Sequence, residues 1–148
     1  MENKATRLGL LMKPVPKIIE RLKADPNVTA LVGSNIYADN PPQDTGLPIV
    51  VLGISNTQVF STVTNCNLKL YVADLTVDII CKTRGASEDT QFAIEDSLIG
   101  FASTDDDFVI EGIVPSTGVD WELLEAIDGS DERGYWCSQT LTINFRRN

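Results

Sequence analysis

Residues 71–81, YVADLTVDIIC, decide the fold, because apolar and polar side chains alternate along the stretch. The apolar positions are Tyr71, Ala73, Leu75, Val77, Ile79 and Cys81. Asp74, Thr76 and Asp78 lie between them. Successive side chains of an extended chain point to opposite faces, so a period of two indicates a strand. The stretch therefore predicts a strand with one apolar face and one polar face.

Further strands are predicted on both sides of this one. Residues 48–55, PIVVLGIS, are apolar on both faces, which predicts a strand in the middle of a sheet. Residues 59–63 are predicted to be its hairpin partner. Residues 108–114 form a predicted strand that Pro115 closes, and the last predicted strand covers residues 136–145.

A first helix is predicted to begin at residues 14–16, PVP, where proline removes no helical hydrogen bond. Its apolar stripe has the i, i+3, i+4, i+7 spacing and consists of Val15, Ile18, Ile19 and Leu22. The Asp25-Pro26 step ends this helix. Residues 26–32 are predicted to add a short turn of helix, which Gly33 ends.

A second helix is predicted to follow a turn at residues 83–86, with Ser87 as its N-cap. Glu88 and Asp89 then lie in its first turn, where carboxylates interact favourably with the helix dipole. Its predicted inner face consists of Ile94, Leu98 and Phe101, widened by Phe92 and Ile99. Residues 105–107, DDD, are predicted to end it.

The order helix, strands, helix, strands predicts an α+β fold. We expect a two-layer sandwich, in which a mostly antiparallel sheet carries two helices packed on one face. The chain of 148 residues is long enough for one continuous hydrophobic core, and it contains no linker, repeat or low-complexity tract. Residues 1–148 are therefore predicted to form a single domain.

The composition excludes several classes of function. The chain has no histidine, which removes the commonest general base and zinc ligand. Its three cysteines, Cys66, Cys81 and Cys137, lack the paired spacing of a metal site and are predicted to be reduced thiols. Apolar runs are too short to cross a bilayer, and no signal peptide is expected. A net charge of −9 disfavours nucleic-acid binding, which needs a basic surface.

The charge is distributed unevenly along the chain. Residues 1–24 contain six Lys or Arg and two Glu, a net charge of +4, whereas the remainder carries −13. A basic segment on an acidic body suggests a surface for a partner or for a neighbouring copy. The alternative is that the basic side chains form the solvated face of one helix.

Candidate catalytic groups are few. Asp74 and Asp78 share a predicted strand face but lie roughly 13 Å apart at strand rise, farther than the carboxylates of a glycosidase. Neither residues 105–107 nor residues 128–132 have the alternating ligand pattern of a calcium loop. Nucleophile, phosphate-binding and dinucleotide motifs are also missing from the sequence. We therefore expect no catalytic residue, no metal and no cofactor, and hence no enzyme.

Trp121 and Trp136 are the remaining candidates, because each follows a polar stretch. Tryptophan is enriched at protein interfaces, which favours a contact with a partner. The alternative is that each tryptophan fills the core at the edge of the sheet.

Around these tryptophans lie the segments STGVDW at residues 116–121, DERGYWCS at residues 131–138 and LT at residues 141–142. With the strand at residues 73–78, their order resembles the tail terminator family of lambda-like phages, to which minor tail protein U belongs. The N-terminal half is similar to the wider group of tail-completion proteins in its helix, Asp25-Pro26, residues 31–33, Ile36-Tyr37, a proline-rich loop and Leu47-Pro48. Val119 departs from the family, which has an aromatic residue at this step.

The resemblance implies a non-enzymatic structural protein of the virion tail, present in the host cytoplasm during assembly. Members form a hexameric ring that caps the tail tube, ends its polymerisation and provides the docking surface for the head. The implied partners are other copies of the chain, the tail tube protein and the head-completion or connector protein. DNA passes through the lumen without specific binding, and no membrane is involved.

The charge pattern and the resemblance together predict a set of subunit or partner contacts: Asp74, Asp78, Arg84, Trp121, Arg133 and Trp136. An acidic lumen would repel the phosphates of passing DNA, because basic contacts are what create affinity for phosphate. Asp74 and Asp78, or the loop at residues 83–87, are therefore predicted to line the lumen or a subunit contact.

The alternative function is an acidic DNA mimic that inhibits a DNA-binding protein. The isoelectric point of about 4.3 fits this function. A mimic should carry its acids in a long surface stripe, and a sheet-rich chain with 43% apolar residues offers no obvious stripe.

Overall fold

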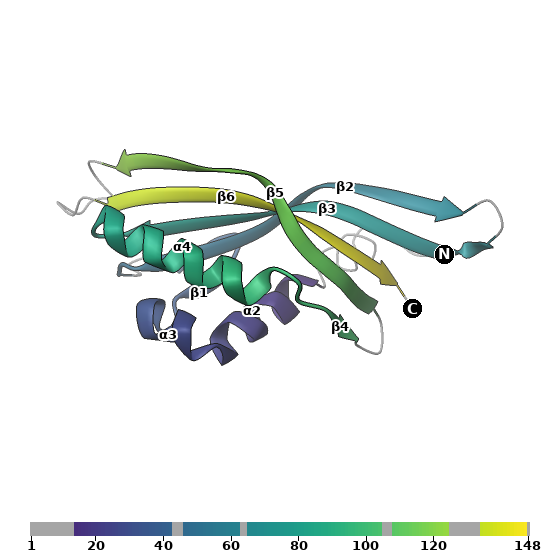
Figure 1. The fold of residues 1–148 in the computed structure, drawn as a ribbon, viewed down its shortest axis with the longest axis horizontal. Helices are drawn as coiled ribbons and strands as arrows, with labels where there is room; N and C mark the ends of the chain where they lie inside the picture. Colours follow the sequence, from purple (N-terminus) through teal and green to yellow (C-terminus); the bar gives the residue numbers. More distant parts are fainter. Residues whose placement is uncertain (1–13, 43–45, 63–64, 105–107, 125–133, 148) are drawn as a thin grey trace.

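A computed structural model describes residues 14–42, 46–62, 65–104, 108–124 and 134–147. The helices in these ranges are α2 (Pro14–Ala24), α3 (Pro26–Val32) and α4 (Arg84–Leu98). The strands are β1 (Ile36–Ala38), β2 (Ile49–Thr62), β3 (Asn65–Cys81), β4 (Ser103–Thr104), β5 (Phe108–Leu124) and β6 (Gly134–Arg147). The α+β class is confirmed, and the described ranges contain the two predicted main helices, α2 and α4, and the predicted short helical segment, α3 (Figure 1).

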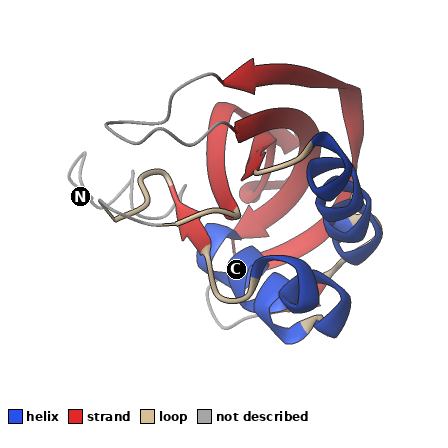
Figure 2. Ribbon diagram, turned by 90° about the vertical axis from the view of Figure 1, so that its left-hand side faces the viewer, coloured by secondary structure: helices blue, strands red, loops and turns tan. Residues whose placement is uncertain are grey.

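The described strands form one six-stranded sheet in the order β1-β2-β3-β6-β5-β4. β1 runs parallel to β2, and the other neighbouring pairs are antiparallel, so the sheet is mixed. Figure 2 shows that the sheet is strongly curled, which corrects the predicted two-layer sandwich. The physical reason is that long strands twist as they extend, and β-bulges add to this twist.

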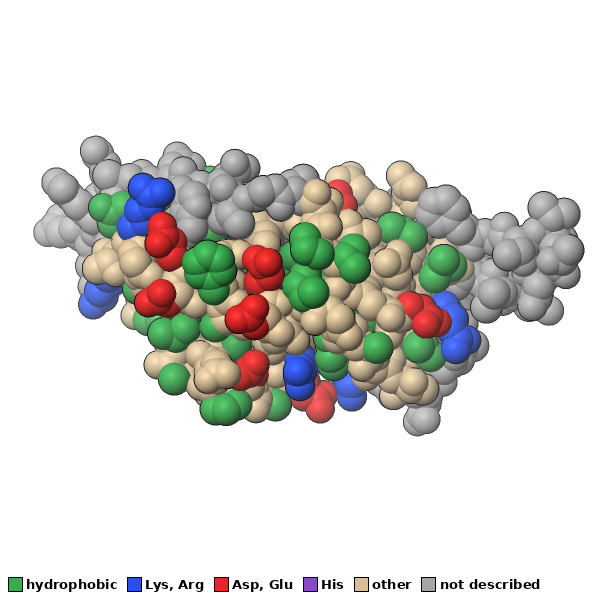
Figure 3. Space-filling view, viewed as in Figure 1, with side chains coloured by type: hydrophobic (Ala, Val, Ile, Leu, Met, Phe, Trp, Pro, Cys, Tyr) green, Lys and Arg blue, Asp and Glu red, His purple; other side chains and the backbone are tan. Residues whose placement is uncertain are grey.

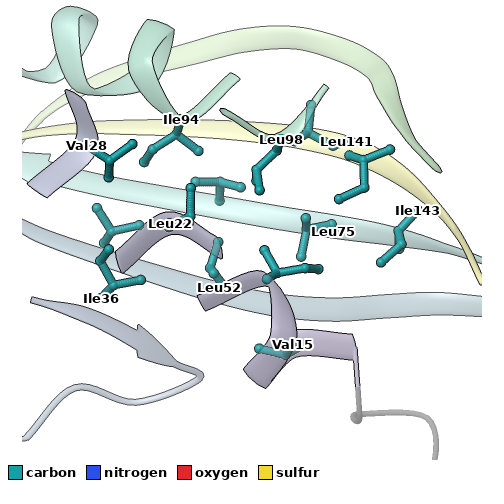
Figure 4. Packing of buried hydrophobic residues seen from close by; sticks show 14 of the residues in the cluster. Val15, Leu22, Val28, Ile36, Leu52, Leu75, Ile94, Leu98, Leu141 and Ile143 are labelled. Carbon is teal, nitrogen blue, oxygen red and sulfur yellow. The ribbon is translucent and has the colours of Figure 1, made fainter. Parts of the chain in front are cut away.

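The helices pack against one face of the sheet and share one core with it. α2 buries Val15, Ile18 and Leu22, which confirms its predicted apolar stripe at these positions. β3 and β6 bury alternate residues on the same face: Ala73, Leu75, Val77, Ile79, Cys81, Cys137, Leu141, Ile143 and Phe145. Figure 4 shows helical side chains, among them Leu22 and Leu98, gathered with Leu75 of β3 and Leu141 of β6. The predicted alternation in both strands is therefore confirmed.

The two N-terminal helices begin and end where predicted. α2 begins at Pro14 and ends before Asp25, whose side chain caps α3 by accepting a hydrogen bond from the Asn27 backbone N at 2.9 Å. Gly33 follows α3 with φ of 61°, a conformation that glycine adopts without the steric cost other residues incur.

β2 is longer than predicted, and the proposed hairpin between residues 48–55 and 59–63 is wrong. The strand continues through residue 62 and pairs with β3 along its length, with a register shift between Ser55 and Gln58. Asn56 has φ of 52° inside this irregularity, and asparagine tolerates the left-handed region better than most residues. The chain therefore bends at the bulge instead of turning back.

β5 continues past Pro115, which was predicted to close it. The strand extends to Leu124, with a register shift relative to β6 between Pro115 and Val119. Proline is tolerated in edge strands and at bulges, because a missing backbone N–H breaks no regular ladder there. Pro115 occupies both kinds of position.

α4 begins four residues before the predicted start. Thr83, and not Ser87, is the N-cap, and its Oγ1 accepts a hydrogen bond from the Ala86 backbone N at 3.1 Å. Ser87 is buried inside the helix and donates a hydrogen bond to the Tyr135 carbonyl oxygen at 3.0 Å. The helix ends at Leu98, and the predicted breaker at residues 105–107 lies outside the described residues.

The predicted inner face of α4 is right in part. Ile94 and Leu98 are buried, and Phe101 packs against the core just after the helix. Phe92 is 61% exposed and Ile99 is 37% exposed, so neither widens this face. The helix buries small and polar residues in their place, at positions that share the helical period of Ile94: Ser87, Thr90, Gln91 and Ser97.

Two strands have long stretches without a described neighbour on one side. β1 pairs only with residues 50–52 of β2, and β4 pairs only with residues 109–110 of β5. Residues 53–62 of β2 and residues 114–124 of β5 are therefore open edges in the part of the sheet that the structure describes.

Candidate interaction surface

Asp74 and Asp78, both predicted contact residues, lie on the sheet face opposite the helices. On this face of β3 they flank Thr76, and all three side chains are half-buried. The β6 residues directly across from them are Thr142, Thr140 and Ser138. We call these six residues the polar face: Asp74, Thr76, Asp78, Ser138, Thr140 and Thr142. Cross-strand partners in a sheet are close enough to interact, so these side chains form one surface.

Trp136 lies beside the polar face and is bound to it. The Trp136 indole Nε1 donates a hydrogen bond to Asp78 Oδ1 at 3.0 Å, between β6 and β3. β6 is an interior strand of the sheet, between β3 and β5. The structure thus brings together two predicted contact residues that are 58 positions apart in sequence.

Asp74 has a different partner within the chain. Its Oδ2 accepts a hydrogen bond from Asn56 Nδ2 at 2.9 Å. Because Asn56 is the positive-φ residue of the β2 irregularity, this bond links Asp74 to the point where β2 bends.

Of the other three predicted contact residues, Arg84 lies away from this surface. Arg84 occupies the first turn of α4, where its Nε lies 3.4 Å from Glu88 Oε1. Trp121 lies on β5 with its backbone opposite Cys137. Arg133 is outside the described residues. The part of the prediction that the structure assembles is therefore Asp74, Asp78 and Trp136.

A buried polar network between α4 and β6 was missed by the sequence analysis. Gln91 Nε2 donates to Glu95 Oε2 at 2.6 Å and to Gln139 Oε1 at 3.0 Å, and Gln139 Nε2 donates to Glu95 Oε2 at 3.0 Å. Gln91 and Gln139 are 2% and 3% exposed. The sequence signal is Gln139 itself, a polar residue on the apolar side of an alternating strand, between Cys137 and Leu141.

The side chains on the polar face are suited to contacts with another protein. The described residues contain no cluster of His, Cys, Asp and Glu that could hold a metal ion. Cys81 and Cys137 are buried thiols that form no disulfide. No helix within the described ranges is long and apolar enough to cross a membrane. On such a face, carboxylates can accept hydrogen bonds from a protein partner, and hydroxyls can both donate and accept them.

Replacing Trp136 by phenylalanine is expected to lower the free energy of unfolding by about 1 kcal/mol, because Asp78 loses its indole donor while the ring stays largely packed. Equilibrium denaturation in urea measures this change. In a variant that already carries Asp78→Ala, the same tryptophan substitution should have a much smaller effect. Equal losses in both backgrounds would show that the hydrogen bond does not stabilise the fold.

Comparison with known proteins gives one family and a structural neighbour. A family model described as "Tail completion protein gp17" matches residues 16–123. A chain of the solved structure described as "Virion of native gene transfer agent (GTA) particle" has a TM-score of 0.62 at 16% sequence identity, and the match covers 87% of this chain and 91% of that chain. At this identity the likeness shows the fold alone. No curated protein matches the chain.

Proposed function

The chain belongs to the tail completion protein gp17 family, and we propose that it forms a ring that caps the tail tube, ends tube polymerisation and provides the surface to which the head docks. The family match carries this proposal, because it begins in α2 and ends in β5 and so includes most of the fold. Membership supports a structural role in a phage tail. It favours this role over that of an acidic DNA mimic and over that of an enzyme.

The ring we propose is hexameric, and its copies are the first partners of the chain. The tail tube protein and the head-completion or connector protein are the others. Tail proteins of this kind assemble in the host cytoplasm and end in the virion. A closed ring needs a contact between two different surfaces of the same chain, repeated around the axis.

The acidic character of the chain suits a ring through which DNA passes. With a net charge of −9 per copy, six copies would repel phosphates instead of binding them. In this proposal Asp74 and Asp78 of the polar face line the lumen or a contact between copies. A hexamer structure with a basic lumen would contradict the lumen assignment.

The proposal is tested by deleting the gene from the phage or phage-like particle that encodes it. Electron microscopy of the lysate should then show tubes of uncontrolled length and heads without joined tails, because nothing caps the growing tube. Supplying the intact chain in trans should restore tails of uniform length joined to heads. Tails of normal length on filled heads in the deletion strain would contradict the proposed function.

A further inference from the structure

Phe92 is a large apolar side chain exposed on the outer surface of α4. At 61% exposure it is the most exposed of the large hydrophobic side chains that the structure describes. The four residues nearest to it on a helix surface, at i−4, i−3, i+3 and i+4, are all acidic: Glu88, Asp89, Glu95 and Asp96. Figure 3 shows acidic side chains gathered over α4 around exposed apolar groups. We call Phe92 with these four residues the acidic knob.

Phe92 does not contribute to the hydrophobic core, because α4 buries the side of the helix opposite to Phe92. Arg84 and Glu88 pair on the helix, and the Glu95 carboxylate accepts the two buried glutamine amides. Asp89 and Asp96 are exposed. An exposed aromatic ring surrounded by charged groups has the composition of an interface anchor with a polar rim.

A shallow cavity with complementary character lies on another surface of the same chain. It has a volume of about 220 Å³ and is lined by Lys17, Glu20, Arg21, Ala24, Phe101 and Ser103. We call it the α2 pocket. A cavity of about 150 Å³ holds a benzene molecule, so a phenyl ring fits this volume. Phe92 is not among the lining residues, and its exposure shows that it does not fill the pocket of its own copy.

The Arg21 side chain is fixed in the α2 pocket by two contacts. Its guanidinium lies 5.5 Å from the centroid of the Phe101 ring, and its Nε donates to the Ser97 carbonyl oxygen at 3.4 Å. Lys17 adds a second cation, and its Nζ is 3.9 Å from Glu20 Oε2. A guanidinium near an aromatic ring is attracted to the face of that ring. The α2 pocket therefore combines an apolar wall with two cations and one carboxylate, Glu20, so its lining has a net positive charge that attracts the acidic knob.

We propose that Phe92 of one copy inserts into the α2 pocket of the next copy, with the exposed carboxylates of Asp89 and Asp96 facing Lys17 and Arg21. The knob and the pocket are different surfaces of one chain, so the contact is heterologous and repeats from copy to copy. This inference rests on the proposed ring and names two of the surfaces that meet in it. It also gives the basic N-terminal region a role, since α2 supplies the cations.

Photo-crosslinking from position 92 tests the contact. The chain is made with p-benzoylphenylalanine in place of Phe92, which keeps an aromatic knob, and is assembled into particles in the host. Irradiation should give a crosslinked dimer, and mass spectrometry should map the link to residues 17–24 or 101–103. Copies with two isotope labels establish that the link joins different chains. The same amino acid at Val59, which is 47% exposed on β2, is the control and should not react with the α2 pocket.

A competition experiment measures the strength of the contact. Wild-type chain and Phe92→Ala are expressed together, and the ratio of the two in purified particles is determined by mass spectrometry. Truncation of an interface anchor should reduce incorporation about thirtyfold, whereas Val59→Ala should enter in the expressed ratio. Because Phe92 is exposed, circular dichroism of Phe92→Ala should match the wild type.

The outcomes separate this inference from the proposed function. Particles that contain the chain as a ring, but give no crosslink from position 92 to the α2 pocket, would overturn the inference and leave the ring intact. Equal incorporation of Phe92→Ala and wild type would overturn it as well. Particles without the chain would overturn both. Weak assembly of Lys17→Glu, restored by adding Asp89→Lys, would support the pairing of pocket and knob.

Discussion

Replacing Leu75 by alanine is expected to lower the free energy of unfolding by about 3 to 4 kcal/mol. Leu75 is completely buried in the middle of β3, between Ile54 of β2 and Leu141 of β6. Because both neighbouring strands and the helices surround it, the structure has little freedom to collapse into the space that alanine leaves. Equilibrium unfolding in guanidinium chloride, followed by tryptophan fluorescence, measures the loss.

The matched control for Leu75→Ala is Thr76→Ala, the next residue of the same strand. Thr76 is half-buried on the polar face, so its substitution should cost less than about 1 kcal/mol. A loss for Leu75→Ala no larger than that for Thr76→Ala would contradict the assignment of the two faces of β3.

The second large effect is expected for Gln139→Leu, which should cost about 2 to 3 kcal/mol. Leucine removes an acceptor from the Gln91 amide and a donor from the Glu95 carboxylate, in a region where Gln91 and Gln139 are almost inaccessible to water. A polar group that is buried without its partner loses its interaction with water and gains nothing in return. Urea denaturation gives the change in free energy.

A double substitution separates the network from simple loss of packing. Gln91→Leu with Gln139→Leu removes both amides, so the combined loss should be clearly smaller than the sum of the two single losses. Thr140→Val, next to Gln139 but on the polar face, is the control and should have a small effect. Strictly additive losses would show that the hydrogen bonds between the two glutamines do not act together.

The elements that could be predicted from the sequence are those that show a pattern in consecutive residues. The apolar stripe of α2, the Asp25-Pro26 step and the alternation in residues 71–81 each express a backbone geometry in consecutive side chains. The structure confirms all three, and it confirms β6 on the same basis.

Elements that depend on distant pairing were not predicted correctly. Asparagine and proline are typical of strand ends, yet Asn56 and Pro115 each lie inside a strand, at a register shift. A bulge is stabilised by the strand alongside, which for β2 is β3 and for β5 is β6. The short parallel pairing of β1 with β2 was also missed. β1 has only three residues, which are too few to show the alternation of apolar and polar side chains that predicts a strand.

In the candidate site, too, local patterns were predicted and contacts between distant residues were not. Alternation placed Asp74 and Asp78 on one polar face, but the hydrogen bond from Trp136 to Asp78 depends on the register of β6 against β3. Phe92 was assigned to the inner face of α4 because it is apolar. The helix instead buries Gln91, since Gln139 of β6 supplies a partner for its amide. The alternation of β6 marks Gln139 as a polar residue on the apolar side, but no local pattern identifies Gln91, 48 residues away, as its partner.

The open edges of β2 and β5 have a colloidal consequence for the free chain. Among the residues that the structure describes, each edge presents backbone donors and acceptors without a strand partner, and such edges in different molecules tend to join without specificity. Mutual repulsion between chains of charge −9 opposes these encounters, and added salt weakens the repulsion as the Debye length falls. The excess of carboxylates therefore also opposes association of molecules through the two strand edges that are open in the described part of the sheet.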